Sequence, residues 1–313
     1  MKKAGLTILS LVIAGMLTAC GGQGAAKQDA ANTQGSSAPA AEKTAQSGAN
    51  AKIASMSIHI TNNLLALGIT PIGSVIGGDV KDFLPHVKDR LQGVAKYGVV
   101  TDPDMEAVLA SKPDVIYLDE VYSGKDISKF QKIAPTETID MDQGTWRDHL
   151  KRIATKVGRE KEADAFIQDY ETKAKKVEGI IKKELGENAK VMAIRTTAKE
   201  LRVMGMKRPL GPIMFEDLKL KPADGVEKIV NDPYQVISQE VLPDFNADAI
   251  FVIVSTGDEA KKNFDMLKTN PVWQNLKAVK NNHVYVLDGQ KWLDYSSLGH
   301  SMALDDAEKL FTK

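Results

Sequence analysis

The sequence predicts an α/β protein of two doubly wound lobes, each with a mainly parallel central sheet, joined by one long interdomain helix. Three observations lead to this fold class. Short β-prone runs alternate with helical patterns in the first half of the chain. Residues 146–185 then carry no strand signal, and the alternation resumes after them. We therefore expect an N-terminal lobe at 51–158, a connecting helix at 159–186 and a C-terminal lobe at 187–313.

The N-terminal lobe is predicted from apolar runs separated by helix signals. A helix at Asn62–Leu67 would end at Gly68, because glycine tolerates the left-handed conformation of a C-cap. Asp102-Pro103 combines a capping residue with a proline suited to a first turn, and the helix that it opens would stop at Lys112-Pro113. The remaining elements expected here are strands at Ile53–Met56, Ile72–Ile76, Val115–Leu118 and Thr136–Ile139, and a helix near Ile127–Ile133.

The middle of the chain predicts two helical segments, Trp146 onward and Glu160–Leu185, with a break at Gly158. The second would be about 39 Å long, given a rise of roughly 1.5 Å per residue. Such a helix is expected to connect two lobes rigidly and to permit only small lobe motion. The elements expected after it are strands at Val191–Arg195, Leu201–Met204, Ala249–Val254 and Val284–Leu287, and helices near Pro212–Leu218, Lys261–Lys268 and Met302–Phe311.

The N-terminus has the features of an export signal. A basic start, Met1-Lys2-Lys3, precedes an apolar run from Leu6 to Ala19 that is shorter than the roughly 20 residues needed to span a bilayer. The run ends in Leu17-Thr18-Ala19-Cys20, which resembles the lipobox of bacterial lipoproteins. This resemblance implies removal of a signal peptide at 1–19 and lipid attachment at Cys20, on the extracellular face of the cell membrane.

The segment after the lipobox is predicted to be a flexible tether, residues 20–50. It is rich in Gly, Ala, Ser and Gln and has no large apolar side chain, so it cannot bury enough surface to offset the entropy of ordering. Cys20 is the only cysteine, which excludes disulfides and cysteine-based metal or catalytic sites from the folded part. The chain has 41 basic and 41 acidic residues, and loss of Lys2 and Lys3 leaves a net charge of −2, which gives no electrostatic reason to expect nucleic-acid binding.

A short repeat occurs once in each predicted lobe. Glu106 lies early in a predicted helix, and Asp114, eight residues later, opens an apolar strand. Glu240 and Asp248 have the same spacing and the same context. One glutamate near a helix start is ordinary because of the helix dipole, but the recurrence in both lobes indicates an internal duplication.

Three stretches carry a specific resemblance. They are MEAVLASKPDVIYL at 105–118, IASMSIHITNNLLALGITPIGSV at 53–75 and NPVWQNLKAVKNNHVYVLD at 270–288. With the lipobox, they resemble the class III (cluster A) solute-binding lipoproteins of ABC importers, in particular the iron–siderophore-binding family of Gram-positive bacteria. The resemblance covers nearly the whole mature chain. In one departure from the family, the tether runs directly into Lys52-Ile53 without the usual hairpin-like stretch, so we expect a shorter or differently covered edge of the first sheet.

The resemblance implies a function without covalent chemistry and without a cofactor. A monomer would capture a ferric siderophore between its lobes and deliver it to an ABC permease dimer with a cytoplasmic ATPase. In relatives, glutamates at the positions of Glu106 and Glu240 dock into arginines on the two permease subunits. The siderophore class, whether hydroxamate, catecholate or carboxylate, stays open. Haem and cobalamin receptors of the same family, and a surface-anchored enzyme on the same tether, are the alternatives.

Enzyme and metal motifs are missing from the sequence. It contains no GxSxG elbow, no GxxxxGK[ST] phosphate loop and no HExxH helix. Asp140-x-Asp142-x-Gly144 is only the beginning of a calcium-loop pattern, and a strand-to-helix turn is the better interpretation. The five histidines lack metal-ligand spacing, so no metal site is predicted. A siderophore supplies the oxygen ligands of its iron, so its receptor needs none.

Candidate ligand-binding residues follow predicted strands, because ligands of open α/β sheets bind at the carboxyl ends of strands. Arg195 ends the first strand of the second lobe, where catecholate- and carboxylate-binding relatives carry an arginine, and its fork of donors suits paired oxygens; a surface salt bridge is the competing role. Trp292 and Tyr295 follow the last strand, where core packing competes with ligand contact. The other candidates are Lys207, Arg208, Tyr122, Lys81 and His59.

Overall fold

The computed structural model describes residues 48, 50–121 and 127–312. The predicted signal peptide, Cys20 and nearly all of the predicted tether lie outside the described residues, as does Tyr122. Within the described part of the chain, no helix is long and apolar enough to cross a membrane.

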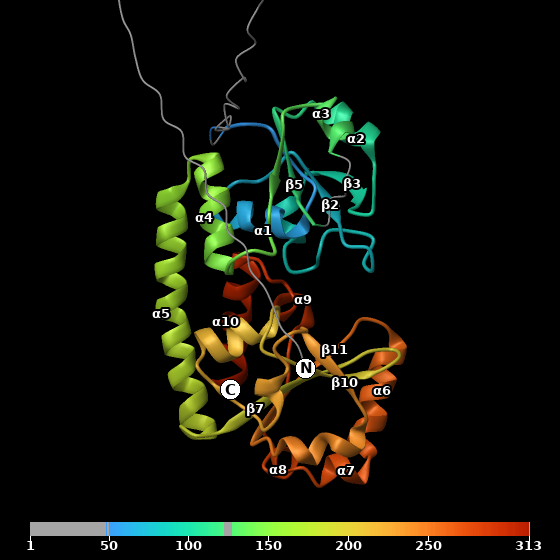
Figure 1. The fold of residues 1–313 in the computed structure, drawn as a ribbon, viewed down its shortest axis with the longest axis vertical. Helices are drawn as coiled ribbons and strands as arrows, with labels where there is room; N and C mark the ends of the chain where they lie inside the picture. Colours follow the sequence, from blue (N-terminus) through green and yellow to red (C-terminus); the bar gives the residue numbers. More distant parts are fainter. Residues whose placement is uncertain (1–47, 49, 122–126, 313) are drawn as a thin grey trace, which may run out of the picture. The chain divides into compact units, whose positions relative to one another are not determined.

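The first sheet has six strands in the order β4-β3-β2-β1-β5-β6 (Figure 1). All neighbouring strands are parallel except β3 and β4. Every residue of β5, an interior strand between β1 and β6, is buried, as expected for a parallel strand that is covered on both faces. The strands are β1 Ile53–Ser55, β2 Gly73–Ile76, β3 Ala95–Val99, β4 Asp102–Pro103, β5 Val115–Asp119 and β6 Thr136–Ile139.

The helices of this lobe confirm the expected alternation, with one correction. Asp102-Pro103 does not open a helix: it forms β4, because a residue before proline favours extended backbone. The helix begins at Met105, and the side chain of Asp104 accepts a hydrogen bond from the Ala107 backbone N–H at 2.9 Å. The helical segments are α1 Ile58–Ala66, η1 Lys88–Leu91, α2 Met105–Ser111 and α3 Ser128–Gln131.

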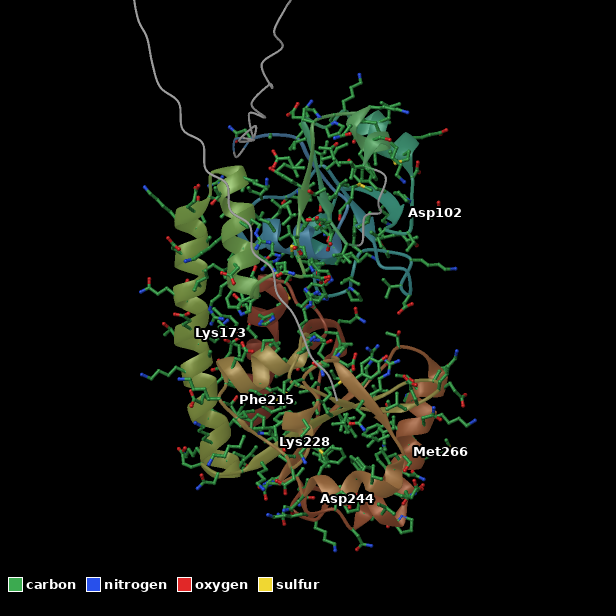
Figure 2. All side chains as sticks on the ribbon, viewed as in Figure 1. Asp102, Lys173, Phe215, Lys228, Asp244 and Met266 are labelled. Carbon is green, nitrogen blue, oxygen red and sulfur yellow. The ribbon has the colours of Figure 1, made fainter. Side chains whose placement is uncertain are left out.

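Two helices lead from the first sheet to the second, α4 Trp146–Val157 and α5 Glu160–Leu185. They are separated at Gly158, which has a φ of 68°, as the sequence predicted. In Figure 1, α5 runs past both sheets. Its buried residues, Val177 among them, belong to one apolar core that also includes Leu64 of α1 and Leu304 of α10. The Nζ of Lys173 on α5 lies 2.7 Å from the carboxylate of Asp305 (Figure 2).

The second sheet has the order β10-β8-β7-β11-β12, with β9 paired to β7. Strands β7, β9, β11 and β12 are parallel, whereas β8 is antiparallel to both β7 and β10. The fold class of two mainly parallel α/β lobes is therefore confirmed. The strands are β7 Lys190–Thr196, β8 Leu201–Met204, β9 Lys221–Pro222, β10 Tyr234–Ile237, β11 Ala249–Val254 and β12 Val284–Val286.

Helical segments follow or cover these strands. They include a π-helical segment, η2, where helical structure was predicted, and a C-terminal helix, α10, that begins five residues before the predicted start. The segments are η2 Pro212–Asp217, η3 Val226–Lys228, η4 Gln239–Phe245, α6 Asp258–Thr269, α7 Pro271–Gln274, α8 Lys277–Lys280, α9 Gly289–Trp292 and α10 Ser297–Phe311.

The sequence repeat corresponds to the same backbone brace in both lobes. Asp114, just before β5, accepts a hydrogen bond from the backbone N–H of Lys52 at 2.8 Å, and its own N–H donates to the Lys52 carbonyl. Asp248, just before β11, makes the equivalent pair with Lys190, at 2.7 Å for both bonds. Each aspartate thus bonds the start of one interior strand, β5 or β11, to the strand beside it, β1 or β7.

Candidate functional site

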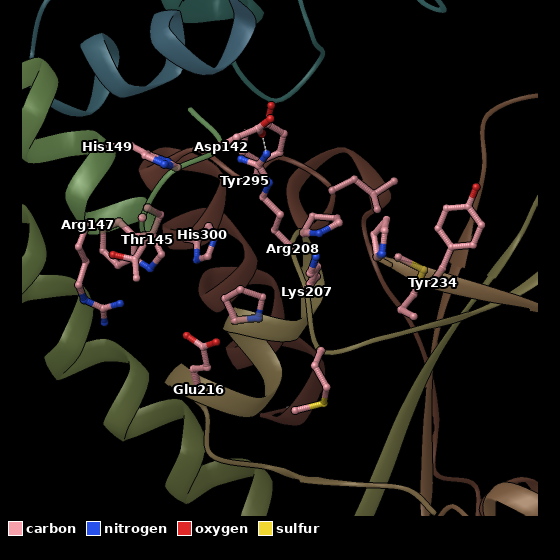
Figure 3. A pocket seen from close by; sticks show the side chains of 18 of the residues that line it. Asp142, Thr145, Arg147, His149, Lys207, Arg208, Glu216, Tyr234, Tyr295 and His300 are labelled. Atoms are coloured by element: carbon pink, nitrogen blue, oxygen red, sulfur yellow. Dashed lines mark ion pairs between the residues drawn. The ribbon is translucent and has the colours of Figure 1, made fainter. Parts of the chain in front are cut away.

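A pocket of about 840 Å³ is lined by residues from both halves of the chain (Figure 3). One wall comes from residues 142–149, which include the start of α4. The other walls come from residues 204–216, 231–234 and 293–300, together with Arg195 at the end of β7. The loops of the second sheet therefore supply most of the lining, at the strand ends where ligands of α/β folds bind.

A tight turn presents the first wall of the pocket. The side chain of Asp140 accepts hydrogen bonds from the backbone N–H groups of Asp142 and Gln143, at 2.8 and 3.1 Å. This is the strand-to-helix turn that the sequence favoured over a calcium loop. A capping box between Thr145 and Asp148 then starts α4 and brings Trp146 to the pocket.

Arg195 is a half-buried cation in the second wall. Its Nε donates to the Ser255 hydroxyl at 2.8 Å, and among the described residues it has no ion pair. The antiparallel register of β7 and β8 places Arg202 directly opposite Arg195. Burial first, and the charge of Arg202 second, lower the pKa of Arg195, against a smaller raising effect of Asp79 and Tyr234.

Arg202 is balanced by its own neighbours. Its guanidinium lies 2.5 Å from the carboxylate of Glu200 and 3.9 Å from the ring centroid of Tyr234. The two adjacent arginines therefore differ in their contacts: Arg202 contacts a carboxylate and an aromatic ring, whereas Arg195 contacts one neutral hydroxyl.

The loop after β8 supplies Lys207 and Arg208. The Nζ of Lys207 donates to the carbonyl of Asn231 at 2.7 Å. Arg208 forms an ion pair with Asp142, and its guanidinium lies 4.4 Å from the ring centroid of Tyr295. Arg208 thus joins the second-lobe loop to the first-lobe turn across the pocket, with its charge already neutralised.

Behind Tyr295 lies a buried polar cluster at the contact between the lobes. His59 stacks on Tyr295 with ring centroids 3.4 Å apart, and its Nδ1 lies 3.4 Å from the carboxylate of Asp294. His86 and Asn62 contact the same carboxylate at 3.0 and 2.7 Å. Burial by itself would raise the pKa of Asp294, but the hydrogen bonds from His59 and His86 outweigh it and hold that pKa far below the usual carboxyl range.

A second buried carboxylate, that of Asp217, contacts two residues of the pocket lining, Arg147 and His300. Tyr170 donates to it at 2.8 Å, the Nη2 of Arg147 lies 3.0 Å away, and His300 lies at 3.7 Å. Burial would raise the pKa of Asp217, but the neighbouring His300, the hydrogen bond from Tyr170 and the charge of Arg147 lower it overall. The positive charge of Arg147 is therefore paired with the carboxylate of Asp217.

Four of the eight predicted ligand residues line the pocket: Arg195, Lys207, Arg208 and Tyr295. His59 lies just behind this lining, against Tyr295. Trp292 is placed in the core: it is 1% exposed, its Nε1 donates to Asp306 at 2.8 Å, and it does not line the pocket. Lys81 is an exposed residue on the loop after β2 and is not part of the lining either.

Several residues of the pocket lining were not predicted from the sequence as ligand contacts, among them Asp142, Trp146, Tyr234 and His300. A signal existed for Trp146, because it directly follows Thr145, the capping residue of α4. The others approach the pocket from distant segments, and nothing in their local sequence marks them. Within the described residues, no group of three or more His, Cys, Asp or Glu side chains could hold a metal ion.

Two mainly parallel lobes, a long connecting helix and a pocket lined from both halves of the chain define the class of two-lobed solute-binding proteins. Residues 53–291 match the family model described as periplasmic binding protein, and the chain belongs to this family.

Several relatives are named for iron or siderophores. The chain is 30% identical to the "Iron(3+)-hydroxamate-binding protein FhuD" of Bacillus subtilis, with 92% of this chain and 90% of that protein covered. It is 29% identical to the "Probable siderophore-binding lipoprotein YfiY" of the same organism, covering 81% of this chain and 80% of the relative. Among solved structures, Staphylococcus aureus SirA in complex with staphyloferrin B superposes with a TM-score of 0.71, at 26% identity, covering 82% of this chain and 91% of that one.

Proposed function

We propose that this protein captures a ferric siderophore in the pocket between its lobes and delivers it to an ABC permease. The observation that carries the proposal is the pocket itself, which is lined from both halves of a chain whose relatives are named as siderophore-binding proteins. Its volume of about 840 Å³ lies within the range of small-molecule sites, roughly 300–1,000 Å³.

The chemistry of the lining suits a ligand rich in oxygen. A siderophore surrounds its iron with its own oxygens, so the protein has to offer hydrogen-bond donors and shape rather than metal ligands. Arg195 and Lys207 supply donors, and Tyr234 and Tyr295 supply aromatic faces for apolar parts of the ligand. Nothing in this arrangement calls for bond making or breaking, so the proposed role is binding and delivery.

Titration of the purified protein with a panel of ligands tests this function. The panel contains ferric hydroxamate, catecholate and citrate-type complexes, haem and cobalamin, and binding is followed by intrinsic fluorescence. We expect saturable, one-to-one binding of at least one ferric siderophore, and weaker binding of haem and cobalamin. Preferential binding of haem or cobalamin, or binding of none of the ferric complexes, would contradict the proposal.

Glu106 and Glu240 are the proposed contacts to the permease dimer, whose cytoplasmic ATPase would drive transport. Both side chains are exposed, and each is the second residue of a helical segment, α2 or η4. Each also precedes one of the two equivalent strand braces by the same spacing. Two separated acidic contacts on a monomer would fix its orientation on the permease better than one.

Membrane attachment through Cys20 completes the proposal, with the lobes at 51–158 and 187–313 held outside the cell by the tether at 20–50. Cys20→Ala should release the protein into the medium or leave its signal peptide uncleaved. Fractionation and N-terminal sequencing measure both. A variant that stays on the membrane with a normally processed N-terminus would show that the anchor lies elsewhere.

A further inference from the structure

The pocket carries more positive than negative charge. Four Lys or Arg side chains and two acidic ones line it, and with Asp217, which pairs with Arg147 from outside the lining, one positive charge remains in surplus. Two of the cations already have acidic partners, because Arg208 pairs with Asp142 and Arg147 with Asp217. Arg195 and Lys207 have no such partner among the described residues. The second acid of the lining, Glu216, is exposed and lies apart from Lys207 and Arg208 in Figure 3.

The sheet places Arg195 where a positive charge is unfavourable. Like charges directly opposite each other on antiparallel strands destabilise the pair, and Arg195 faces Arg202 in this way. Arg202 is compensated by Glu200 and Tyr234, which leaves Arg195 as the uncompensated member. The acid whose charge acts on Arg195 is Asp79, an exposed residue of the first-lobe loop after β2, and among the described residues the two form no ion pair.

The donors of Arg195 are also only partly used. Its Nε bonds to the Ser255 hydroxyl, and its two terminal nitrogens have no hydrogen-bond partner among the described residues. A half-buried guanidinium with unused donors is less stable than one in water, because burial disfavours its charge and no carboxylate of the described residues pairs with it to compensate for the lost hydration. An anionic oxygen pair at this position would match the free face of the fork.

We propose that the ligand is a ferric complex of net negative charge, with carboxylate or catecholate oxygens that bind the terminal nitrogens of Arg195 and the ammonium of Lys207. The inference rests on the proposed function and sharpens it by naming the ligand class. Ferric trihydroxamates are neutral or, with a free amine, cationic, and they would leave both cations without an opposite charge. The second lobe would then hold most of the ligand's charge, Trp146 would close the first-lobe side, and Tyr295 would contact the ligand where the two lobes meet.

Affinity measured across a charge series tests this inference. The series consists of a ferric tris-catecholate and a ferric α-hydroxycarboxylate complex, both anionic, a neutral ferric trihydroxamate, and a trihydroxamate with a free amine. We expect at least one anionic complex to bind 10-fold or more tighter than either trihydroxamate, with an affinity that falls as salt is raised. The two anionic arms distinguish the sources of the charged oxygens.

Variants connect the preference to the two cations. Arg195→Gln should weaken binding of the preferred anionic complex by roughly 10- to 100-fold, the scale of a hydrogen bond between charged groups, and change trihydroxamate binding little. Lys207→Gln should act in the same direction but less, because Lys207 is exposed. Arg90→Gln on η1 and Lys262→Gln on α6 make the same charge changes away from the pocket, and should leave all affinities unchanged.

Two results would overturn the inference, and they differ in what they leave standing. A trihydroxamate that binds as tightly as the anionic complexes, with no selective loss in Arg195→Gln, would remove the ligand class and keep the proposed function. If neither the wild-type protein nor any variant binds a ferric complex, although all have the same Tm, both the proposed function and this inference are overturned.

Discussion

The two lobes share a structural device but differ in what they give to the pocket. In both lobes, an aspartate just before an interior strand, β5 or β11, is bonded to the backbone at the start of the neighbouring strand: Asp114 to Lys52 and Asp248 to Lys190. Only the second lobe adds antiparallel strands beside its central strand β7, and those strands bring Arg202 opposite Arg195. Its loop after β8 adds Lys207. The duplicated part of the sequence builds the scaffold, whereas the unpaired cations of the pocket come from the part that is not duplicated.

The contact between the lobes should show the largest effect on stability. Asp294→Asn removes the charge that accepts hydrogen bonds from His59, His86 and Asn62, and should cost about 3 kcal/mol of unfolding free energy, measured by urea denaturation at pH 7. Asp305→Asn on α10 is the control, because the exposed pair of Asp305 with Lys173 contributes little.

The same variant should change the pH dependence of stability. The pKa of Asp294 is lower in the folded than in the unfolded protein, so its contribution is full above the unfolded carboxyl pKa, about 4, and is lost as the pH falls toward the folded value. Wild type should therefore lose more stability than Asp294→Asn between about pH 5 and pH 2. Parallel stability curves for the two proteins over this range would contradict the assignment.

The two strand braces should differ in strength although they have the same geometry. Asp248→Ala should cost about 1 kcal/mol, because the carboxylate also pairs with Lys277 and is more buried, and Asp114→Ala should cost less because Asp114 is exposed. Burial would raise the pKa of Asp248, but Lys277 and the Lys190 backbone lower it overall, so its contribution should also fade at acid pH. Equal costs would show that the backbone bonds alone carry both braces.

Tryptophan fluorescence should distinguish the pocket from the rest of the core. All three tryptophans are buried, but only Trp146 lines the pocket, whereas Trp292 and Trp273 do not. Quenching on binding of a ferric ligand should therefore be largely lost in Trp146→Phe and kept in Trp292→Phe. A quench that depends on Trp292 would place the ligand nearer to α9 than the pocket lining implies.

The exposed glutamates should have the smallest effect on the isolated protein. Glu106→Ala and Glu240→Ala, alone or together, should leave Tm and ligand affinity unchanged, because both side chains are exposed. Uptake of the iron complex by cells should fall in each variant and fall furthest in the double variant. Normal uptake by cells that carry only the double variant would contradict the docking proposal.

The elements best predicted were those with a strong local pattern. Strands β6, β8 and β11 and the break at Gly158 agree with the expected bounds. Strand β10 was missed because it is a short edge strand directly after Pro233, paired only with β8. The start of α2 was misplaced because Asp102 and Asp104 are both capping residues, and Asp102, which precedes Pro103, is extended and pairs with β3.

The fold class, the family and the residue types at the strand ends could be predicted from the chain alone, because these depend on local periodicity and on motifs contiguous in the chain. Which candidates meet in one site depends on contacts between distant segments. Trp292 and Tyr295 are three residues apart, yet Trp292, at the end of α9, packs in the core, and Tyr295, in the segment between α9 and α10, lines the pocket. His59 and Asp294 are 235 residues apart and touch. Contacts between distant segments are set by how the packed lobes bring them together, and no local pattern encodes that.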